Sequence, residues 1–499
     1  MAFVTLAPPP GVFRNGTLYQ AKSRWRDANL IRFQQDQIKP VGGWRLRSDA
    51  AAFTGAARAV LSWRDNSNSR WIAIGTHSKL YAQAEDGANA DLTPTGFASG
   101  RPDAAQNLGY GGGTYGGGLY GAPPPNTVAY LPASVWSLDT WGEDLVGCCD
   151  TDGNIYLWEL DPGTSAAVVS AAPSDCQGLV VAEEGFLFAL GAGGDGRKIA
   201  WCDQRDLSQW TPDATNQAGD YDLATVGTLQ CGKAVAGGVL AFTDVDVWRA
   251  AYIGAPLVYG FERVGSGCGV ISKGAVSARD SVAAWMGRGG FWLYDGQGVQ
   301  PLDCDVQDHV FGSLNPDQVS KVSAVHLADY GEVWWFYPSA DSVECDRYVA
   351  WAYRESQRQG RNVWTIGHMA RLSGSGRGVY PRPLMVDASG YLYEHEAGLA
   401  YGGAQPFIES GPIELGQGDV QAELQRIAPD GLADGDAAVT LYGRLWPNGP
   451  ESVLGPLALT SPTDVLFQAR ELRLRFTGAS GADWRIGAMR LDIVPGDPL

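Results

Sequence analysis

Residues 282–294 read VAAWMGRGGFWLY, two apolar runs separated by four residues of which three are glycine. Glycine adopts the positive φ angles that tight hairpin turns need, and aromatic and β-branched residues favour strands. Both runs are apolar at consecutive positions, as expected of strands that are covered on both faces. The stretch therefore predicts a β-hairpin in the interior of a layered β structure.

The same hairpin pattern recurs down the middle of the chain. Seven copies of its second run can be aligned, and the steps between them are 76, 43, 48, 45, 57 and 43 residues. Steps of roughly 40 to 50 residues are typical of the four-stranded blades of a β-propeller. We therefore predict an all-β fold, with a β-propeller of about seven blades over residues 51–402. The aligned positions are Leu80, Tyr156, Ile199, Val247, Trp292, Val349 and Leu392.

The composition favours the same fold class. The chain has 66 Gly and 28 Pro for turns, and 18 Trp, 20 Tyr and 15 Phe for bulky packing between sheets. Aromatic residues at regular strand positions pack in cores far more often than they stack on ligands. We therefore assign the repeated Trp and Tyr positions to contacts between blades.

A different pattern begins at about residue 403. Several segments there alternate apolar and polar residues, which is typical of antiparallel strands with one buried and one solvated face. They predict a small C-terminal β-sandwich over residues 403–499. The segments are residues 412–415, 438–445, 471–476 and 484–493.

The first 50 residues differ in charge from the rest of the chain. They carry eight Arg or Lys and three Asp, a balance of +5, although the whole chain has a formal net charge of −18. A basic segment is most often a solvated face, but aromatic residues interleave with these charges, so we expect an N-terminal arm that folds onto another surface. Two short strands are expected in it, at residues 29–33 and 37–41. Its candidate assembly contacts are Arg24, Trp25, Arg26, Arg32 and Phe33.

A glycine-rich stretch at residues 109–125 interrupts the repeat. Tyr and Leu punctuate its glycine runs, and three prolines end it. Such a composition does not form regular sheet, and long surface loops often contact partners. We therefore expect a loop that projects from the propeller, with Tyr110, Tyr115 and Tyr120 as further candidate assembly contacts.

Motifs that carry catalysis are missing from the sequence. It has no GxSxG, HExxH or phosphate-binding P-loop pattern. The best acidic candidates, Asp150 with Asp152 and Asp244 with Asp246, fall in expected hairpin turns, where Asp favours local backbone hydrogen bonds. The sequence therefore predicts a protein that is not an enzyme and that holds no cofactor or metal.

The cysteines and the lack of targeting signals bear on the compartment. The eight cysteines show no CxxC spacing, so we expect small buried hydrophobes in a reducing compartment. Neither a signal peptide nor a run of 18 apolar residues is found, so we expect a soluble protein without a membrane partner. The acidic chain as a whole would repel phosphates, which argues against tight nucleic-acid binding.

Several runs resemble the tail proteins of short-tailed bacteriophages, and most nearly the tail nozzle, also called the packaged-DNA stabilisation protein. The resemblance covers most of the chain, and the family has no catalytic residues to carry over. The runs are residues 13–17 (FRNGT), 25–33 (WRDANLIRF), 40–44 (PVGGW), 63–66 (WRDN), 71–76 (WIAIGT), 484–487 (WRIG) and 490–492 (RLD).

This resemblance implies a structural virion protein of the phage tail, assembled in the host cytoplasm. Such nozzles form a ring, here expected to be a homohexamer, that extends and closes the DNA channel below the portal and adaptor and retains the packaged genome. The implied partners are adaptor or head-to-tail connector proteins and tail needle or fibre proteins. Double-stranded DNA would pass without specific binding, and an acidic channel wall fits that role because it repels phosphates.

Two other classes of protein are also compatible with the sequence. A glycan-binding or glycan-degrading tail component would need an exposed cluster of Trp and acidic residues on one propeller face. A cellular scaffold of the WD-repeat kind would need paired Gly-His and Trp-Asp signatures at blade spacing, which the sequence lacks.

Overall fold

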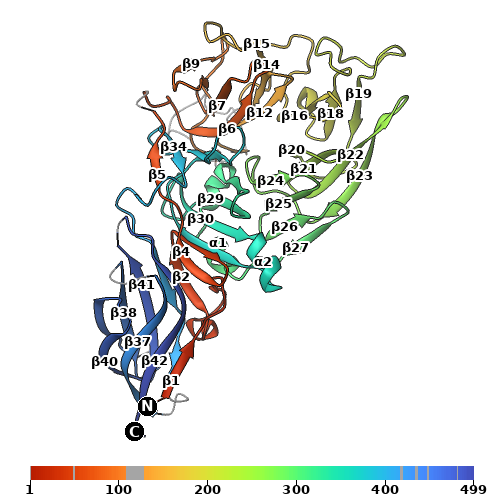
Figure 1. The fold of residues 1–499 in the computed structure, drawn as a ribbon. Helices are drawn as coiled ribbons and strands as arrows, with labels where there is room; N and C mark the ends of the chain where they lie inside the picture. Colours follow the sequence, from red (N-terminus) through yellow and green to blue (C-terminus); the bar gives the residue numbers. More distant parts are fainter. Residues whose placement is uncertain are drawn as a thin grey trace, which may run out of the picture.

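Two β units make up the part of the chain that the computed structural model describes, residues 2–48, 51–107, 129–415, 420–432, 436–446, 449–479 and 481–498. A propeller of seven four-stranded sheets lies at one end and a two-sheet sandwich at the other, where both chain termini are found (Figure 1). The predicted all-β class, a propeller of about seven blades with a C-terminal sandwich, is therefore confirmed. No helix among the described residues is long and apolar enough to cross a membrane.

Each blade is an antiparallel sheet of four strands, and the first six blades take their strands in sequence order. They are blade 1, β6 (Ala57–Arg64), β7 (Arg70–Thr76), β8 (Leu80–Gln83) and β9 (Asn89–Asp91); blade 2, β12 (Trp136–Trp141), β13 (Asp144–Cys149), β14 (Ile155–Trp158) and β15 (Ala167–Val168); blade 3, β16 (Gly178–Val181), β17 (Leu187–Leu190), β18 (Lys198–Trp201) and β19 (Gly219–Asp222); blade 4, β20 (Leu229–Val235), β21 (Gly238–Thr243), β22 (Asp246–Gly254) and β23 (Val258–Ser266); blade 5, β24 (Val276–Arg279), β25 (Val282–Met286), β26 (Phe291–Tyr294) and β27 (Val299–Leu302); and blade 6, β28 (Ser323–Leu327), β29 (Glu332–Pro338), β30 (Cys345–Ala352) and β31 (Trp364–His368).

The repeated hairpin of the sequence is the pairing of the second and third strands of each blade. In blade 5, β25 pairs with β26 so that Trp285 lies opposite Trp292 and Met286 opposite Phe291. The turn before β14 shows why glycine is required, because Gly153 has a φ of 65° and an added Cβ would lie 2.5 Å from the backbone of Asp175. Turn chemistry and apolar strands therefore locate this hairpin from the sequence.

Tryptophans tie neighbouring blades together. The indole N–H of Trp136 in blade 2 donates to the Thr76 carbonyl in blade 1 at 2.8 Å, and that of Trp335 in blade 6 donates to the Ala275 carbonyl at the start of blade 5 at 2.9 Å. Both rings are buried. Trp335, which lies in one of the repeated apolar runs, thus connects two blades as predicted, and Trp136 makes the same kind of contact from a first strand.

Blade 7 combines segments from distant parts of the chain. Its first three strands are β32 (Ser373–Ser375), β33 (Leu384–Val386) and β34 (Leu392–His395), and its fourth is β5 (Trp44–Leu46). In the antiparallel pairing of β5 with β34, Trp44 lies opposite His395. Because β32 also contacts β6 of blade 1, the circle of blades is closed.

The sandwich consists of two six-stranded sheets and also takes strands from both chain ends. One sheet has the order β3-β4-β42-β37-β40 with β1 on β42, and the other has the order β2-β35-β41-β38-β39 with β36 on β41. The N-terminal strands are β1 (Ala2–Leu6), β2 (Trp25–Asn29), β3 (Ile31–Gln34) and β4 (Gln37–Pro40); the C-terminal strands are β35 (Phe407–Ser410), β36 (Ile413–Glu414), β37 (Val420–Leu432), β38 (Ala437–Arg444), β39 (Ser452–Ala458), β40 (Thr463–Ala469), β41 (Glu471–Gly478) and β42 (Arg485–Pro498).

The basic N-terminal segment is therefore part of both units instead of a separate arm. Its first four strands complete the sandwich, and β5 completes the propeller. A single hydrophobic core continues from blades 5 and 6 into the sandwich and includes Trp25, Phe33 and Trp364. The first 46 residues thus contribute strands to both units and join them.

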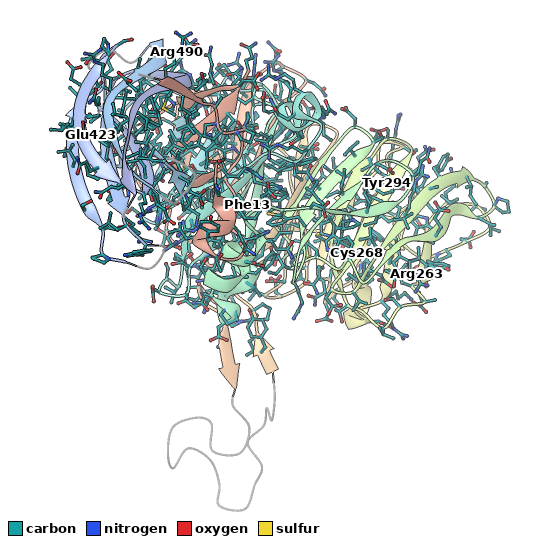
Figure 2. All side chains as sticks on the ribbon, turned by 90° about the horizontal axis from the view of Figure 1, so that it is seen from below. Phe13, Arg263, Cys268, Tyr294, Glu423 and Arg490 are labelled. Carbon is teal, nitrogen blue, oxygen red and sulfur yellow. The ribbon has the colours of Figure 1, made fainter. Side chains whose placement is uncertain are left out.

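Outside the blades, a two-stranded ribbon of β10 (Ala105–Asn107) and β11 (Ala129–Leu131) stands out from the body (Figure 2). Tyr130 anchors it, since its hydroxyl donates to the Asp317 carbonyl at 2.8 Å. The glycine-rich stretch at 109–125, with Tyr110, Tyr115 and Tyr120, lies outside the described residues.

Candidate functional site

A buried ion-pair network joins the sandwich to blades 6 and 7, and we call it the Arg32 junction. Arg32 on β3 lies 2.7 Å from Glu332 on β29 and 2.8 Å from Glu396, which follows β34. Its guanidinium also lies over the Tyr330 ring, 3.4 Å from the centroid. Only 2% of the Arg32 side chain is exposed. Burial disfavours the charge, but the two carboxylates outweigh burial and raise the pKa of Arg32.

The carboxylates of the Arg32 junction have further partners. Glu332 accepts a hydrogen bond from the Trp334 indole at 2.9 Å, and Glu396 accepts one from the Gly42 backbone N–H at 2.9 Å. Burial acts to raise the pKa of Glu396, but Arg32 outweighs it and holds that pKa below its usual range. Both carboxylates accept further hydrogen bonds, so the described polar groups of the network are paired within the chain. The network therefore stabilises the contact between the sandwich and the propeller and is not a binding site for a partner.

This arrangement corrects three of the predicted assembly contacts. Trp25, Arg32 and Phe33 are buried inside the protomer and cannot touch another chain. Basic and aromatic residues interleave in this segment because its strands alternate between two environments. The aromatic side chains fill the shared core, and Arg32 reaches carboxylates of the propeller.

Two predicted contacts, Arg24 and Arg26, keep partial exposure and remain predictions. Arg24 pairs with Asp305 at 2.7 Å and lies over the Phe13 ring, which is labelled where the sandwich meets the propeller in Figure 2. Burial, and next the charge of Arg14, lower the pKa of Arg26. One buried guanidinium nitrogen of Arg26 has no hydrogen-bond partner in the described ranges.

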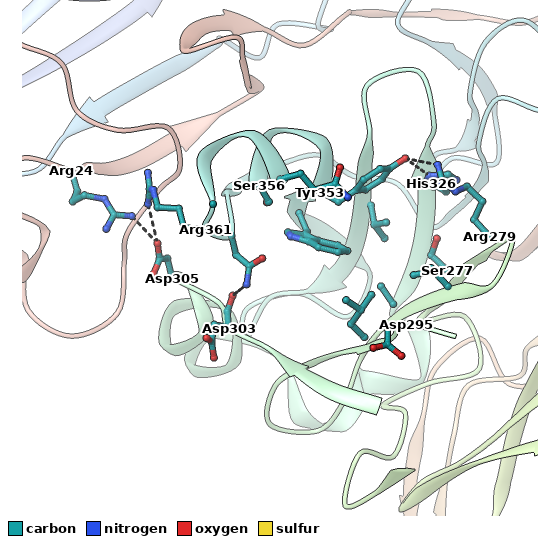
Figure 3. Close-up of a pocket in the computed structure, with 18 residues that line it drawn as sticks. Arg24, Ser277, Arg279, Asp295, Asp303, Asp305, His326, Tyr353, Ser356 and Arg361 are labelled. Carbon is teal, nitrogen blue, oxygen red and sulfur yellow. Dashed lines mark hydrogen bonds and ion pairs between the residues drawn. The ribbon is translucent and has the colours of Figure 1, made fainter. Parts of the chain in front are cut away.

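A groove of about 810 Å³ opens between blades 5 and 6, and we call it the 5–6 groove (Figure 3). Strands β24, β25 and β26 form one wall, and β28, β29, β30 and helix α2 (Tyr353–Gln359) form the other. The groove exists because radially arranged sheets diverge toward the outside of a propeller. Its apolar lining residues are Val282, Ala284, Leu293, Val333 and Trp351.

Trp351 is an unusual member of this lining. Its side chain is largely buried, with 8% of the residue exposed, yet its indole N–H has no hydrogen-bond partner among the described residues. Leaving such a donor unpaired costs about 1–3 kcal/mol. The next tryptophan in the same sheet, Trp364, is satisfied, because its indole donates to the Asp303 carbonyl at 2.9 Å. Within the described residues, the chain therefore leaves this buried donor unused.

At one end of the groove, three polar side chains form a hydrogen-bonded group (Figure 3). The Tyr353 hydroxyl lies 3.0 Å from His326 Nε2 and accepts a hydrogen bond from Arg279 at 3.0 Å. Burial, and next the charge of Arg279, lower the pKa of His326. Its imidazole is therefore neutral near pH 7 and serves as a hydrogen-bonding partner of Tyr353.

Carboxylates line the remainder of the rim. Asp305 is shared by Arg24 and Arg361 at the other end of the groove (Figure 3). Asp295 and Asp303 have no ion pair with any described residue. Backbone N–H groups of Gly298 and Gln297 lower the pKa of Asp295, so this carboxylate is ionised. The groove thus carries two acidic groups without a counter-charge.

The central channel of the propeller is smaller than the groove. It holds about 320 Å³ and is lined by the inner strands of all seven blades, with Asp139, Lys233 and Lys273 among its polar residues. Burial raises the pKa of Asp139, which accepts hydrogen bonds from the backbone of Val181 and Thr140. A channel of this volume cannot admit a nucleic-acid duplex.

The acidic pairs singled out in the sequence take part in local bonding. Asp152 accepts from the Asn154 backbone at 3.2 Å, and Asp246 accepts from the Thr243 hydroxyl at 2.6 Å, which confirms the turn interpretation there. Asp150 has an additional role that the sequence did not indicate. It forms a buried ion pair with Lys273 at 2.9 Å, which links blade 2 to the entry of blade 5.

Sequence reasoning missed both the Arg32 junction and the 5–6 groove. Glu332, Glu396, Asp295 and Asp303 lie in no motif, and they reach their places only through the circular order of the blades. Trp351 lies two residues after the aligned repeat position Val349, so the sequence pattern assigns it to contacts between blades. A signal for the groove could have been sought in the charged residues that flank the strands of blades 5 and 6.

No protein-family model and no curated protein sequence matches the chain. Similar solved structures include virginiamycin B lyase from Staphylococcus aureus, with 7% identity and a TM-score of 0.41, covering 70% of this chain and 99% of that one. The WD40 domain of Pan2 from Neurospora crassa has 7% identity and a TM-score of 0.36, covering 72% and 96%. Puromycin hydrolase has 11% identity and a TM-score of 0.35, covering 82% and 62%.

Proposed function

We propose that this protein is a structural component of a bacteriophage tail, a ring-forming nozzle that extends and closes the DNA channel below the portal and adaptor. It would retain the packaged genome until infection and would act without catalysis. The observation that carries the proposal is the joining of both β units by the first 46 residues. A channel component under the load of a packaged genome has to transmit force without its domains separating.

The residues that carry the sequence resemblance support this reasoning by their positions. Trp25 lies in the core shared by both units, Arg32 forms the Arg32 junction, and Trp44 begins the strand that closes blade 7. Two of the runs that resemble tail nozzles, residues 25–33 and 40–44, therefore contribute residues to the joints of the architecture. Residues at such joints specify how two units are held together.

The proposed path of DNA lies outside the protomer. The central channel of the propeller, about 320 Å³, is too small for a duplex, so the channel would run along the axis of the ring. A chain with a formal net charge of −18 presents a surface that repels phosphates, and this would let DNA slide without specific binding. A closed ring requires a heterologous interface between neighbouring copies.

Electron microscopy tests the proposal. Purified virions and the recombinant protein would be imaged, and mass spectrometry of the virions would identify the chain. We expect a ring, with six copies, at the distal end of the tail channel and adaptor or connector proteins above it. A protein that is monomeric both in free form and in particles, or that is absent from virions, would overturn the proposal.

The glycan-binding alternative has weaker support in the geometry. It calls for an exposed aromatic platform beside acidic groups, whereas Trp351, which lies near Asp295 and Asp303 in the 5–6 groove, is largely buried. Degradation of a host polysaccharide in a plate assay would favour the alternative over the nozzle.

A further inference from the structure

The 5–6 groove contains unused hydrogen-bonding and charged groups that the fold does not explain. The Trp351 indole N–H, on a largely buried side chain, has no acceptor within the described part of the chain. Asp295 and Asp303 have no counter-charge. Buried or semi-buried polar groups normally find partners inside a protein. The groove therefore combines one buried donor without an acceptor with two exposed carboxylates that have no counter-charge among the residues described, and a ligand can match both.

The chemistry of these groups defines the ligand. A buried N–H donor above an apolar floor calls for a carbonyl acceptor next to apolar side chains. The two free carboxylates call for a cation, since the three arginines of the rim are already held. Arg24 and Arg361 share Asp305, and Arg279 pairs with Asp280 at 3.1 Å. A ligand that combines carbonyls, apolar groups and one positive charge satisfies the whole set.

The dimensions favour a peptide over a single small cation. A volume of about 810 Å³ lies in the upper part of the range of about 300–1,000 Å³ for ligand sites, so one amine or one side chain would leave most of the groove empty. An extended segment presents a carbonyl at every residue and alternates its side chains between two walls. It can therefore reach the indole donor and the acidic rim at the same time.

We propose that the 5–6 groove is a docking site for an extended peptide segment of another protein that carries a lysine or an arginine. The segment lies between the walls of blades 5 and 6, a main-chain carbonyl accepts from Trp351, the basic side chain pairs with Asp295, and Asp303 adds negative charge toward the other end of the groove. The aliphatic part of that side chain covers the floor at Val282 and Leu293. This site does not depend on the nozzle proposal, because any propeller with this groove could use it.

The test is selection from a displayed library of random heptapeptides on the immobilised full-length chain. Val282→Arg places a bulky cation in the groove at a residue that is 36% exposed, and Val343→Arg is its matched control, at a residue 57% exposed that does not line the groove. We expect peptides that carry Lys or Arg to be enriched on the wild-type protein and on Val343→Arg, but not on Val282→Arg. Thermal unfolding verifies that both variants are folded.

A second variant tests the charge without filling the groove. Asp295→Asn with Asp303→Asn keeps the size of both side chains, and we expect it to weaken the selected peptides about fivefold or more. Asp213→Asn, at an exposed turn elsewhere, is the control and should change nothing. Trp351→Phe keeps an aromatic ring but removes the donor, and we expect a loss of about threefold.

Three results would overturn the proposal. The first is a selection in which no peptide is enriched on the wild-type protein over Val282→Arg. The second is enrichment of peptides without a basic residue, or of peptides that bind the double Asn variant as tightly as the wild type. The third is binding to a glycan array that Val282→Arg abolishes, which would assign the groove to carbohydrate.

Discussion

The Arg32 junction and the 5–6 groove are both boundaries of the propeller. The polar groups of the junction are paired within the chain, whereas the groove has polar groups that lack an acceptor or a counter-charge in the described part of the chain. At the junction, a strand from the N-terminal segment brings a guanidinium to two buried carboxylates, and the neighbouring N–H groups complete their bonding. At the groove the N-terminal segment reaches only one end, where Arg24 pairs with Asp305, and among the described residues an indole N–H has no acceptor and two carboxylates have no counter-charge. A gap between blades is therefore sealed only where the chain supplies a segment to seal it.

The paired groups of the Arg32 junction stabilise the fold, whereas the exposed groups of the 5–6 groove are available to bind a ligand. Buried ions stabilise only when every partner is present, so the junction is costly to break. Groups on an open rim contribute little to the free energy of unfolding, because solvent already satisfies most of them. Mutations at the two places should consequently differ in what they affect, stability at the junction and ligand binding at the groove.

The largest expected effect is at the Arg32 junction. Arg32→Ala leaves Glu332 and Glu396 buried without a counter-charge, and we expect it to lower the free energy of unfolding by about 3–5 kcal/mol. Arg45→Ala is the control, because Arg45 pairs with Glu394 at 2.8 Å but is 64% exposed, and it should cost about 0–1 kcal/mol. Urea unfolding of both variants measures the difference. Equal losses would show that the junction is not a structural joint.

The closing strand of blade 7 should give the next largest effect. Trp44 stacks on His395 with ring centroids 5.5 Å apart and lies under the guanidinium of Arg371 at 4.9 Å. We expect Trp44→Ala to destabilise the protein by about 2–3 kcal/mol. Trp446→Ala removes a tryptophan that contacts Arg470 at 4.4 Å on an exposed surface, and about 1 kcal/mol is expected there. A loss at Trp446 as large as that at Trp44 would contradict a closing role of β5.

Acidification should lower the free energy of unfolding more through His395 in blade 7 than through His326 at the groove. Burial, and next Arg371, hold the pKa of His395 well below its usual value, and burial also lowers the pKa of His326 at the groove. Below about pH 6.5 the unfolded chain binds protons that the folded chain does not, so stability falls as the pH decreases from 7 toward the folded pKa values.

Urea unfolding at pH 7 and pH 5 measures this loss. In His395→Gln the side-chain oxygen can still accept from Arg371, and no proton is taken up, so we expect a smaller loss between the two pH values than in the wild type. His326→Gln, at a less buried position, should reduce the loss by a smaller amount. If His395→Gln loses as much stability between pH 7 and pH 5 as the wild type, the assignment of this loss to His395 is refuted.

The smallest effect compares two tryptophans that flank the groove. Trp364→Phe removes an indole that donates to the Asp303 carbonyl, whereas Trp351→Phe removes an indole without a partner. Both changes remove a similar ring area, so the difference reports the hydrogen bond. We expect Trp364→Phe to cost about 1 kcal/mol more than Trp351→Phe in thermal unfolding. No difference between them would mean that the Trp351 donor has an acceptor in solution.

Local features of the fold could be predicted from the sequence. The hairpins of the blades combine a turn, as at Gly153, with two neighbouring apolar strands, and all of this information lies within about 15 residues. The alternating strands of the sandwich were located for the same reason. In β38, Val439 and Leu441 point inward while the residues between them are partly exposed.

Long-range pairings could not be predicted in the same way. β5 has only three residues, and its partner β34 lies about 350 residues further along the chain, so no local pattern connects Trp44 with His395. Burial of Trp25 and Phe33 was misjudged because a basic and aromatic segment can cover a partner or its own protein equally well. The groove depends on which blades become neighbours and on how far their walls diverge, which residue spacing does not encode.

The pairing of β1 with β42 determines when this sheet of the sandwich can form during biosynthesis. β1 pairs with β42, where Ala2 lies opposite Ile493, so β1 leaves the ribosome about 490 residues before its partner does. At about 5–20 residues per second that delay lasts roughly 25–100 s. During this time the emerging strands have unpaired edges, which are sites of aggregation. This sheet of the sandwich is therefore completed only after β42 has been synthesised, and chaperones that shield nascent strands should raise the yield of folded protein.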